Sequence, residues 1–193
     1  MLVDGKWVEN WQPVQNKDAK GGFVRQTSSF RNWVTPDGRP GPTGTGGFTA
    51  EKDRYHLYVA LICPWASRTL IARRLKGLQD SVSLSVVEPF LTDQGWRFGN
   101  YPGADQDTLN GATWIHELYT RADPHFTGRA TVPVLWDKKT RTIVNNESAE
   151  IICMCNAGFG ALAPAEYDLY PVALPLTNHT LNYHPYLPLT NWV

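Results

Sequence analysis

The clearest structural signal in the chain is a pair of apolar-polar alternating stretches that flank a segment of helical spacing. Residues 55–61 read Tyr-His-Leu-Tyr-Val-Ala-Leu, and residues 81–87 read Ser-Val-Ser-Leu-Ser-Val-Val. Alternation over such lengths is typical of β-strands. Between them, the apolar residues of 64–75 recur at helical spacing. The three segments therefore predict a βαβ unit, with the right-handed crossover that nearly all such units have.

The elements after this unit follow a recognisable order. A long, polar, glycine-bearing connection runs from about 89 to 107, and long loops in compact domains tend to be functional or disordered. We predict a helix over about 108–121, strands at 131–136 and 142–144 that form a hairpin, and a last helix from 148 to about 156. The order β-α-β-α-β-β-α indicates an α/β protein with a thioredoxin-like fold.

The two ends of the chain lack such periodicity. Residues 1–50 carry turn signals and a glycine-rich run at 41–47, which lacks the Gly-Lys-Ser/Thr of a phosphate loop. Proline, asparagine and threonine in the last residues disfavour a stable helix. We therefore predict an irregular N-terminal extension (1–50), a thioredoxin-like domain (51–160), and a linker with a non-helical tail (161–193).

Composition narrows the range of partners. The 193 residues are 42% hydrophobic and 12% aromatic, which suffices for a sizeable core. The 18 basic and 18 acidic residues give zero formal net charge, and this balance argues against a nucleic-acid or anionic-membrane partner. The first residues lack a secretory signal pattern, and no apolar stretch approaches the length of a membrane span. We therefore expect a cytoplasmic protein.

The three cysteines and the histidines do not suggest a metal site. Cys153 and Cys155 lie two residues apart, so a helix would point them in different directions. The cysteine spacings match neither a disulfide framework nor paired zinc ligands, and the histidines lack zinc-binding spacing. We predict no metal, and we interpret these two cysteines as core residues.

The tetrapeptide Cys63-Pro64-Trp65-Ala66 lies between the first strand and the first helix. A cysteine there meets the unpaired N–H groups and the positive end of the helix dipole, which favour the nucleophilic thiolate. Proline is well suited to the first helical position. With alanine at position 66, an outside thiol would have to resolve any mixed disulfide. From spacing alone, a buried structural cysteine remains an alternative.

Several segments together resemble a known family. The tetrapeptide 63–66, the run Gly-Phe-Thr-Ala-Glu-Lys-Asp-Arg-Tyr within 41–58, and the segments 131–137 and 146–152 resemble the glutathionyl-hydroquinone reductases, the Xi class of glutathione transferases. The resemblance covers roughly residues 1–174 and implies the N-terminal domain of a glutathione transferase. It also implies an enzyme whose cysteine attacks the sulfur of a glutathionyl-hydroquinone, releasing hydroquinone and leaving a mixed disulfide that a second glutathione resolves.

The resemblance also implies which residues form the site. Cys63 is the implied nucleophile, and glutathione is the implied co-substrate. Glu147 would pair with the α-ammonium of glutathione, and Ser148 with its α-carboxylate. The segment before Pro133, which the resemblance implies is cis, would pair with the cysteinyl backbone. The implied glutathione-binding residues are Trp96, Arg129, Ala130, Thr131, Val132, Glu147 and Ser148.

Three of these residues also have plainer interpretations. Without the resemblance, Trp96 is as readily an anchor for its loop as a residue that stacks on glutathione. Arg129 is implied to pair with a glutathione carboxylate, and the alternative is an ordinary solvated arginine. Ser148 alone would more often be a simple helix cap.

The tail departs from the family pattern. Members continue for more than a hundred residues as a helical domain, whereas here the resemblance stops near residue 174. We therefore expect a truncated or frame-shifted product in which hydroquinone release is impaired, since Tyr183 and Tyr186 do not match the family's tyrosines. The alternatives are an inactive fragment that only binds glutathione and a general glutaredoxin-like thiol transferase. The expected partners are glutathione and glutathionylated hydroquinones, and the resemblance suggests a homodimer.

Overall fold

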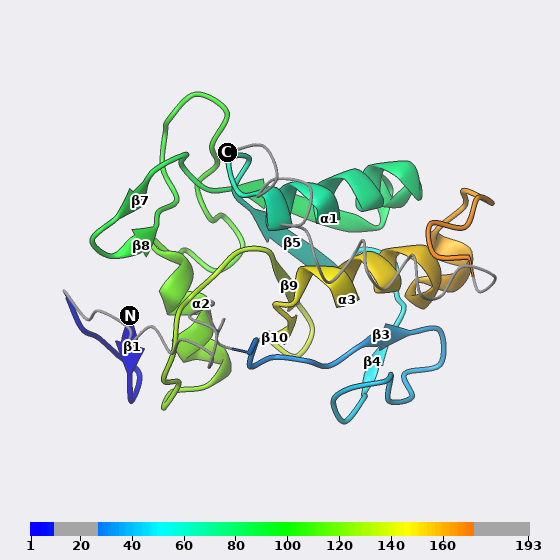
Figure 1. Cartoon of the computed structure of the whole chain (residues 1–193), viewed down its shortest axis with the longest axis horizontal. Helices are drawn as coiled ribbons and strands as arrows, with labels where there is room; N and C mark the ends of the chain where they lie inside the picture. The colour runs from blue at the N-terminus through cyan, green and yellow to red at the C-terminus, as the bar shows by residue number, and fades with distance from the viewer. Residues whose placement is uncertain (10–26, 172–193) are drawn as a thin grey trace, which may run out of the picture.

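The core of the molecule is a mixed four-stranded sheet with the strand order β10-β9-β5-β6 (Figure 1). The computed structural model describes residues 1–9 and 27–171. Strand β5 (Tyr55–Val59) is buried along its whole length and pairs in parallel with β6 (Val82–Val86). This pairing confirms the βαβ unit that the alternating pattern predicts.

The other half of the sheet is the predicted hairpin. Strand β9 (Val134–Asp137) runs antiparallel to β5 and to β10 (Thr142–Asn145). Two helices, α1 (Pro64–Leu75) and α3 (Ser148–Cys153), pack against each other. Together with the βαβ unit, this arrangement confirms the thioredoxin-like fold.

The second helix, α2 (Ile115–Ala122), is shorter than the predicted helix over 108–121. The cause is the carboxylate of Asp107, which is 4% exposed. It accepts hydrogen bonds from three main-chain N–H groups in residues 109–112 and from the Tyr58 hydroxyl, at 3.0–3.2 Å. Because the carboxylate satisfies these N–H groups in a turn, the helix begins later.

Short elements complete the described structure. A π-helical turn at Met154–Gly158 extends α3, and 3-10 turns lie at Leu78–Asp80 and Gly160–Leu162. The short strands are β1 (Leu2–Val3), β2 (Lys6–Trp7), β3 (Val34–Thr35), β4 (Phe48–Thr49), β7 (Leu91–Thr92) and β8 (Gly95–Trp96).

The described part of the extension is attached to the sheet. The β9–β10 register shifts between Ile143 and Asn145, and there residues 30–32 pair with the β10 edge. Asn32 N–H donates to the carbonyl of Val144 at 3.0 Å. The extension therefore continues the backbone pairing of the sheet where α3 begins.

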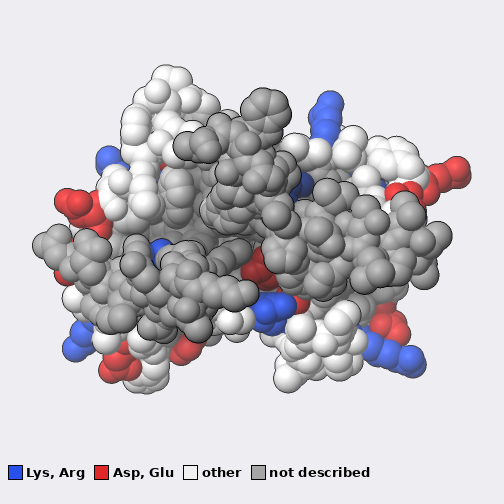
Figure 2. Space-filling model, in the orientation of Figure 1, with Lys and Arg blue, Asp and Glu red and all other residues white. Residues whose placement is uncertain are grey.

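Some expectations fall outside the described residues. These include most of the predicted tail after residue 171, with Tyr183 and Tyr186, and residues 10–26 of the extension. Over the described part of the face in Figure 2, acidic and basic side chains are interspersed. None of the described helices is both long enough and apolar enough to cross a bilayer.

A buried histidine lies on the central strand. His56 is 6% exposed, its Nδ1 is 2.7 Å from Ser83 Oγ, and its Nε2 has no hydrogen-bond partner among the described residues. Burial lowers the pKa of His56 to about 4, because the charged imidazolium loses its hydration in the core. As the pH falls through about 6.5, the unfolded chain therefore binds a proton at His56, whereas the native chain does not.

We expect His56 to make the protein less stable as the pH falls from about 6.5 towards about 4, because the unfolded state binds the extra proton. Between pH 7.5 and 5 this coupling amounts to about 2 kcal/mol of unfolding free energy. Urea unfolding of the wild type and His56→Gln at both pH values measures it. The wild type should lose about 2 kcal/mol more than the variant, and equal losses would contradict the assignment. The contributions of all other groups are common to both proteins and cancel in the comparison.

Candidate active site

Cys63 lies where the sequence predicts, at the junction of β5 and α1. It is the N-cap of the helix, with extended backbone (φ −89°, ψ 113°), and Pro64 occupies the first helical position. The first turn of this 12-residue helix carries no acidic residue. The partly exposed thiol therefore lies at the positive end of the helix, with no competing carboxylate in the first turn.

The other two thiols are poor nucleophiles. Cys155 is 4% exposed, and burial raises its pKa to about 12. Burial also raises the pKa of Cys153, and the nearby Glu150 carboxylate adds to the effect. All three cysteines lie in the described part of the chain and are free. Cys63 is therefore the thiol best placed for nucleophilic chemistry.

The Val132–Pro133 peptide bond is cis, as the resemblance implies, and it lies beside the thiol. Cys63 Sγ is 3.8 Å from the Val132 carbonyl oxygen. The Tyr119 hydroxyl donates to the Thr131 carbonyl at 2.9 Å and accepts from the Thr131 N–H at 3.1 Å. The Thr131 main chain is therefore engaged, while the Val132 N–H makes no hydrogen bond to another described residue.

The start of α3 gathers the second group of site residues. Glu147 is the N-cap of α3, and its Oε1 accepts from the Ala149 N–H at 3.4 Å. Arg68 reaches across from α1 and donates to Ser148 Oγ through Nε at 3.1 Å and Nη2 at 2.6 Å. The same Nη2 lies 4.0 Å from Glu147 Oε1. A cation, a carboxylate and a hydroxyl thus meet on the helix pair that includes the Cys63 helix.

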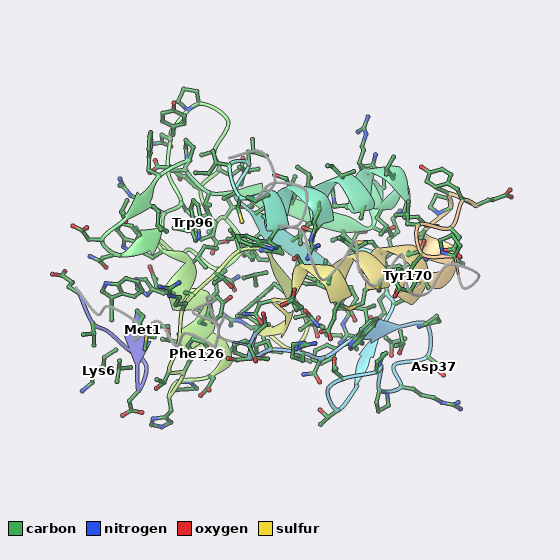
Figure 3. The ribbon with its side chains drawn as sticks, viewed as in Figure 1. Met1, Lys6, Asp37, Trp96, Phe126 and Tyr170 are labelled. Atoms are coloured by element: carbon green, nitrogen blue, oxygen red, sulfur yellow. The ribbon has the colours of Figure 1, made fainter. Side chains whose placement is uncertain are left out.

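The other predicted residues lie on other segments of the chain. Trp96 is half-buried in the β7–β8 hairpin, at the opposite end of the molecule from Asp37 (Figure 3). Arg129 is exposed, and Ala130 packs partly on the core. Among the described residues, no hydrogen bond or ion pair joins Trp96 or Arg129 to the groups at Cys63 or α3. The described residues also contain no cluster of His, Cys, Asp and Glu suited to a metal.

Sequence reasoning missed two residues of the site, Arg68 and Ser28. Arg68 lies in the second turn of the Cys63 helix, and its neighbour on α3 is 80 residues away. Ser28 Oγ donates to Glu147 Oε2 at 2.9 Å from the extension, across 119 residues. An arginine close to a nucleophilic cysteine on one helix was an available signal for Arg68, whereas the pattern around Ser28 offered none.

Comparisons with known proteins identify the domain that contains these residues. Residues 62–157 match the glutathione S-transferase N-terminal domain. Residues 62–157 form a glutathione S-transferase N-terminal domain. This domain includes the Cys63 helix and the start of α3, and the match confirms the expected domain type.

The relatives of this glutathione transferase domain include members of the Xi class. The chain is 55% identical over all 193 residues to the glutathionyl-hydroquinone reductase YqjG of Escherichia coli K12, and it covers 58% of that protein. It is 40% identical to the glutathionyl-hydroquinone reductase PcpF of Sphingobium chlorophenolicum, again covering 58%. The chain therefore spans less than two thirds of these relatives. The YqjG alignment also runs past residue 174, where the resemblance was expected to stop.

Solved structures show the same relationship. The glutathione-bound YqjG structure superposes with a TM-score of 0.83 and 52% identity, covering 96% of this chain and 54% of that one. The Xi glutathione transferase of Phanerochaete chrysosporium superposes with a TM-score of 0.77 and 48% identity, covering 86% of this chain and 55% of that one. These matches confirm the resemblance to the Xi class.

Proposed function

We propose that this chain binds glutathione and that Cys63 carries it as a mixed disulfide in the reaction of a glutathionyl-hydroquinone reductase. The observation that carries the proposal is the position of Cys63 at the N-cap of α1, with its Sγ facing the Val132 carbonyl. The two most similar relatives described above are named as such reductases, and one of them has a glutathione-bound structure.

The proposed binding mode uses each end of the tripeptide. The cysteinyl backbone pairs with the Val132 N–H and carbonyl, in the manner of an added strand. Glu147 takes the α-ammonium, while Ser148 and Arg68 hold the α-carboxylate through charge-assisted hydrogen bonds. Arg129 pairs with the glycyl carboxylate, and Trp96 stacks on the ligand. Ala130 and Thr131 complete the segment that leads to Val132.

The proposed chemistry is two thiol exchanges. The Cys63 thiolate attacks the sulfur of a glutathionyl-hydroquinone, so that an S–S bond forms and the carbon–sulfur bond breaks. The ring carbon gains a proton and leaves as hydroquinone, and the two sulfurs are oxidised to the mixed disulfide. A second glutathione thiolate then attacks the glutathionyl sulfur, releasing glutathione disulfide and regenerating the Cys63 thiolate.

Intact-mass measurement and a turnover assay together test this proposal. Glutathione disulfide should add one glutathione to Cys63, and free glutathione should remove it. Purified chain should then release hydroquinone from a glutathionyl-hydroquinone. A loss of two protons without added mass would indicate an internal disulfide and contradict the monothiol mechanism, as would the absence of any adduct.

A second candidate function is glutathione binding without efficient turnover. One side of the Cys63 helix exposes large apolar side chains, since Ile71 is 57% exposed and Leu75, one turn later, is 43% exposed. Such a patch is typical of a surface that contacts another protein segment. Retained glutathione affinity with negligible hydroquinone release would favour this function. Glutathione-dependent reduction of disulfide substrates, in place of hydroquinone release, would instead favour a glutaredoxin-like thiol transferase.

We further infer two properties from the family resemblance and the composition. The resemblance suggests a homodimer, which analytical ultracentrifugation can measure. A cytoplasmic location agrees with three free cysteines, because reducing compartments keep thiols reduced.

A further inference from the structure

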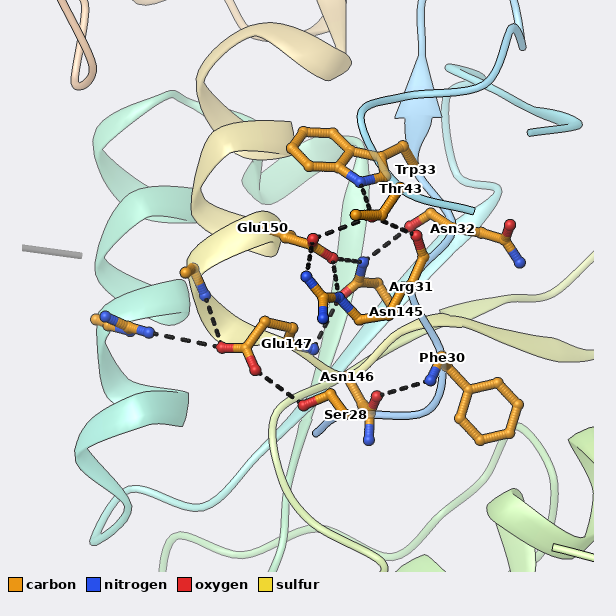
Figure 4. A network of polar contacts seen from close by, with 12 residues as sticks. Ser28, Phe30, Arg31, Asn32, Trp33, Thr43, Asn145, Asn146, Glu147 and Glu150 are labelled. Atoms are coloured by element: carbon orange, nitrogen blue, oxygen red, sulfur yellow. Dashed lines mark hydrogen bonds and ion pairs between the residues drawn. The ribbon is translucent and has the colours of Figure 1, made fainter. Parts of the chain in front are cut away.

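The described part of the extension reaches the start of α3. We call residues 28–43 the strap. It runs antiparallel to the end of β10 and past Glu147 (Figure 4). Phe30 and Asn146 are joined twice, because the Phe30 N–H donates to Asn146 Oδ1 and the Asn146 N–H donates to the Phe30 carbonyl, each at 3.1 Å. The strap is therefore fixed to the residues immediately before the helix.

A buried carboxylate anchors the strap to α3. Glu150 is 3% exposed, and its Oε2 accepts from Arg31 Nε at 2.7 Å and from Asn145 Nδ2 at 2.8 Å. Arg31 Nη2 also contacts Glu150 Oε1, and the Thr43 hydroxyl lies 3.0 Å from that oxygen. Trp33 Nε1 donates to the same hydroxyl at 2.7 Å. This network holds the strap in place independently of Ser28.

The strap places the Ser28 hydroxyl next to Glu147 in the candidate glutathione site. Ser28 Oγ donates to Glu147 Oε2 at 2.9 Å, and the Glu147 N–H donates to Asn145 Oδ1 at 2.7 Å. The other oxygen, Oε1, faces the Ala149 N–H and Arg68. Both carboxylate oxygens and the backbone of Glu147 are therefore oriented. The side chain of Glu147 remains 14% exposed.

We propose that Ser28 is a positioning residue that holds the Glu147 carboxylate in the orientation that receives the α-ammonium of glutathione. This inference rests on the proposed function. A hydrogen bond to a charged group orients it before the ligand arrives, so less rotamer freedom is lost on binding. Without the hydroxyl, the fold should persist because the Glu150 network remains, while the ammonium site becomes less ordered.

The test compares two ligands on the full chain. Glutathione carries the α-ammonium, whereas N-acetylglutathione has a neutral amide in its place. The variants are Ser28→Ala, the conservative Ser28→Thr, and Ser29→Ala as the matched control, because Ser29 is exposed and lies next to Ser28. Calorimetric titration gives Kd for each pair, and thermal unfolding reports stability.

We expect Ser28→Ala to raise the Kd for glutathione about three- to tenfold, the range expected for one hydrogen bond to a charged group that water partly replaces. The Kd for N-acetylglutathione should stay unchanged. Ser28→Thr should restore the glutathione affinity, and Ser29→Ala should match the wild type.

The remaining outcomes distinguish a failure of the Ser28 positioning role from a failure of the proposed function. Equal weakening for both ligands, no weakening for either, or unfolding of Ser28→Ala would overturn the positioning role while wild-type binding still supports the proposed function. A wild-type chain that binds neither ligand would overturn the proposed function and this inference with it.

Discussion

Replacing Cys63 by serine is expected to abolish the mixed disulfide at this position. Formation of any glutathione adduct on the chain should then be at least about 10³-fold slower than in the wild type. A serine hydroxyl cannot form a disulfide, and the remaining thiols have raised pKa values because they are buried. Intact mass after treatment with glutathione disulfide measures the adduct. Cys153→Ser is the control, and it should keep the full adduct.

The same substitution should leave the glutathione affinity and the fold nearly unchanged. The only hydrogen bond of the Cys63 side chain to another described residue is the weak 3.8 Å contact with the Val132 carbonyl. We therefore expect a change of less than about 1 kcal/mol in the free energy of unfolding and a Kd within about twofold of the wild type. A glutathione adduct that persists in Cys63→Ser would show that another thiol is the nucleophile.

The sequence predicted the sheet well because its strands alternate or are buried along their length. Strands β5 and β6 and helix α1 lie within about two residues of the predicted limits. The start of α2 was misplaced because a single carboxylate, that of Asp107, replaces helical hydrogen bonds with a turn. A side-chain effect of that kind leaves the hydrophobic spacing of the segment unchanged.

Part of the candidate site can be predicted from local chemistry along the chain. A helix-start cysteine, a cis-proline segment and a Glu-Ser pair before a helix are readable along the chain, and the structure places Cys63 beside Val132. Arg68 and Ser28 were missed because their partners lie 80 and 119 residues away. Trp96 and Arg129 rest on the family resemblance, so their roles stay predictions until a glutathione complex is measured.

The extension was predicted to be irregular because it lacks periodicity, yet its described part is held to the domain by long-range polar contacts. Arg31, Asn32 and Thr43 each pair with a residue more than 100 positions away, in β10 or at the start of α3. No hydrophobic pattern encodes such pairing. These contacts connect the extension to the candidate site, and Glu150 lies at their centre.

Glu150→Ala is therefore expected to be strongly destabilising, by about 3–5 kcal/mol, because the partly buried Arg31 guanidinium loses its ion pair with this buried carboxylate. The Asn145 amide and the Thr43 hydroxyl lose the same partner. Glu150→Gln keeps hydrogen-bond acceptors but not the charge, so its loss should be smaller. Urea unfolding measures both variants.

The matched control is Arg39→Ala, which removes an ion pair to Asp37 whose side chains are 85% and 54% exposed. Exposed pairs contribute about 0–1 kcal/mol, so this variant should remain close to the wild type. Because the strap carries Ser28, Glu150→Ala should also weaken glutathione binding under conditions where the variant is folded. Equal stability of Glu150→Ala and Arg39→Ala would show that the strap is not anchored by the Glu150 carboxylate. If Glu150→Ala is destabilised but its glutathione Kd is unchanged, the strap does not contribute to glutathione binding.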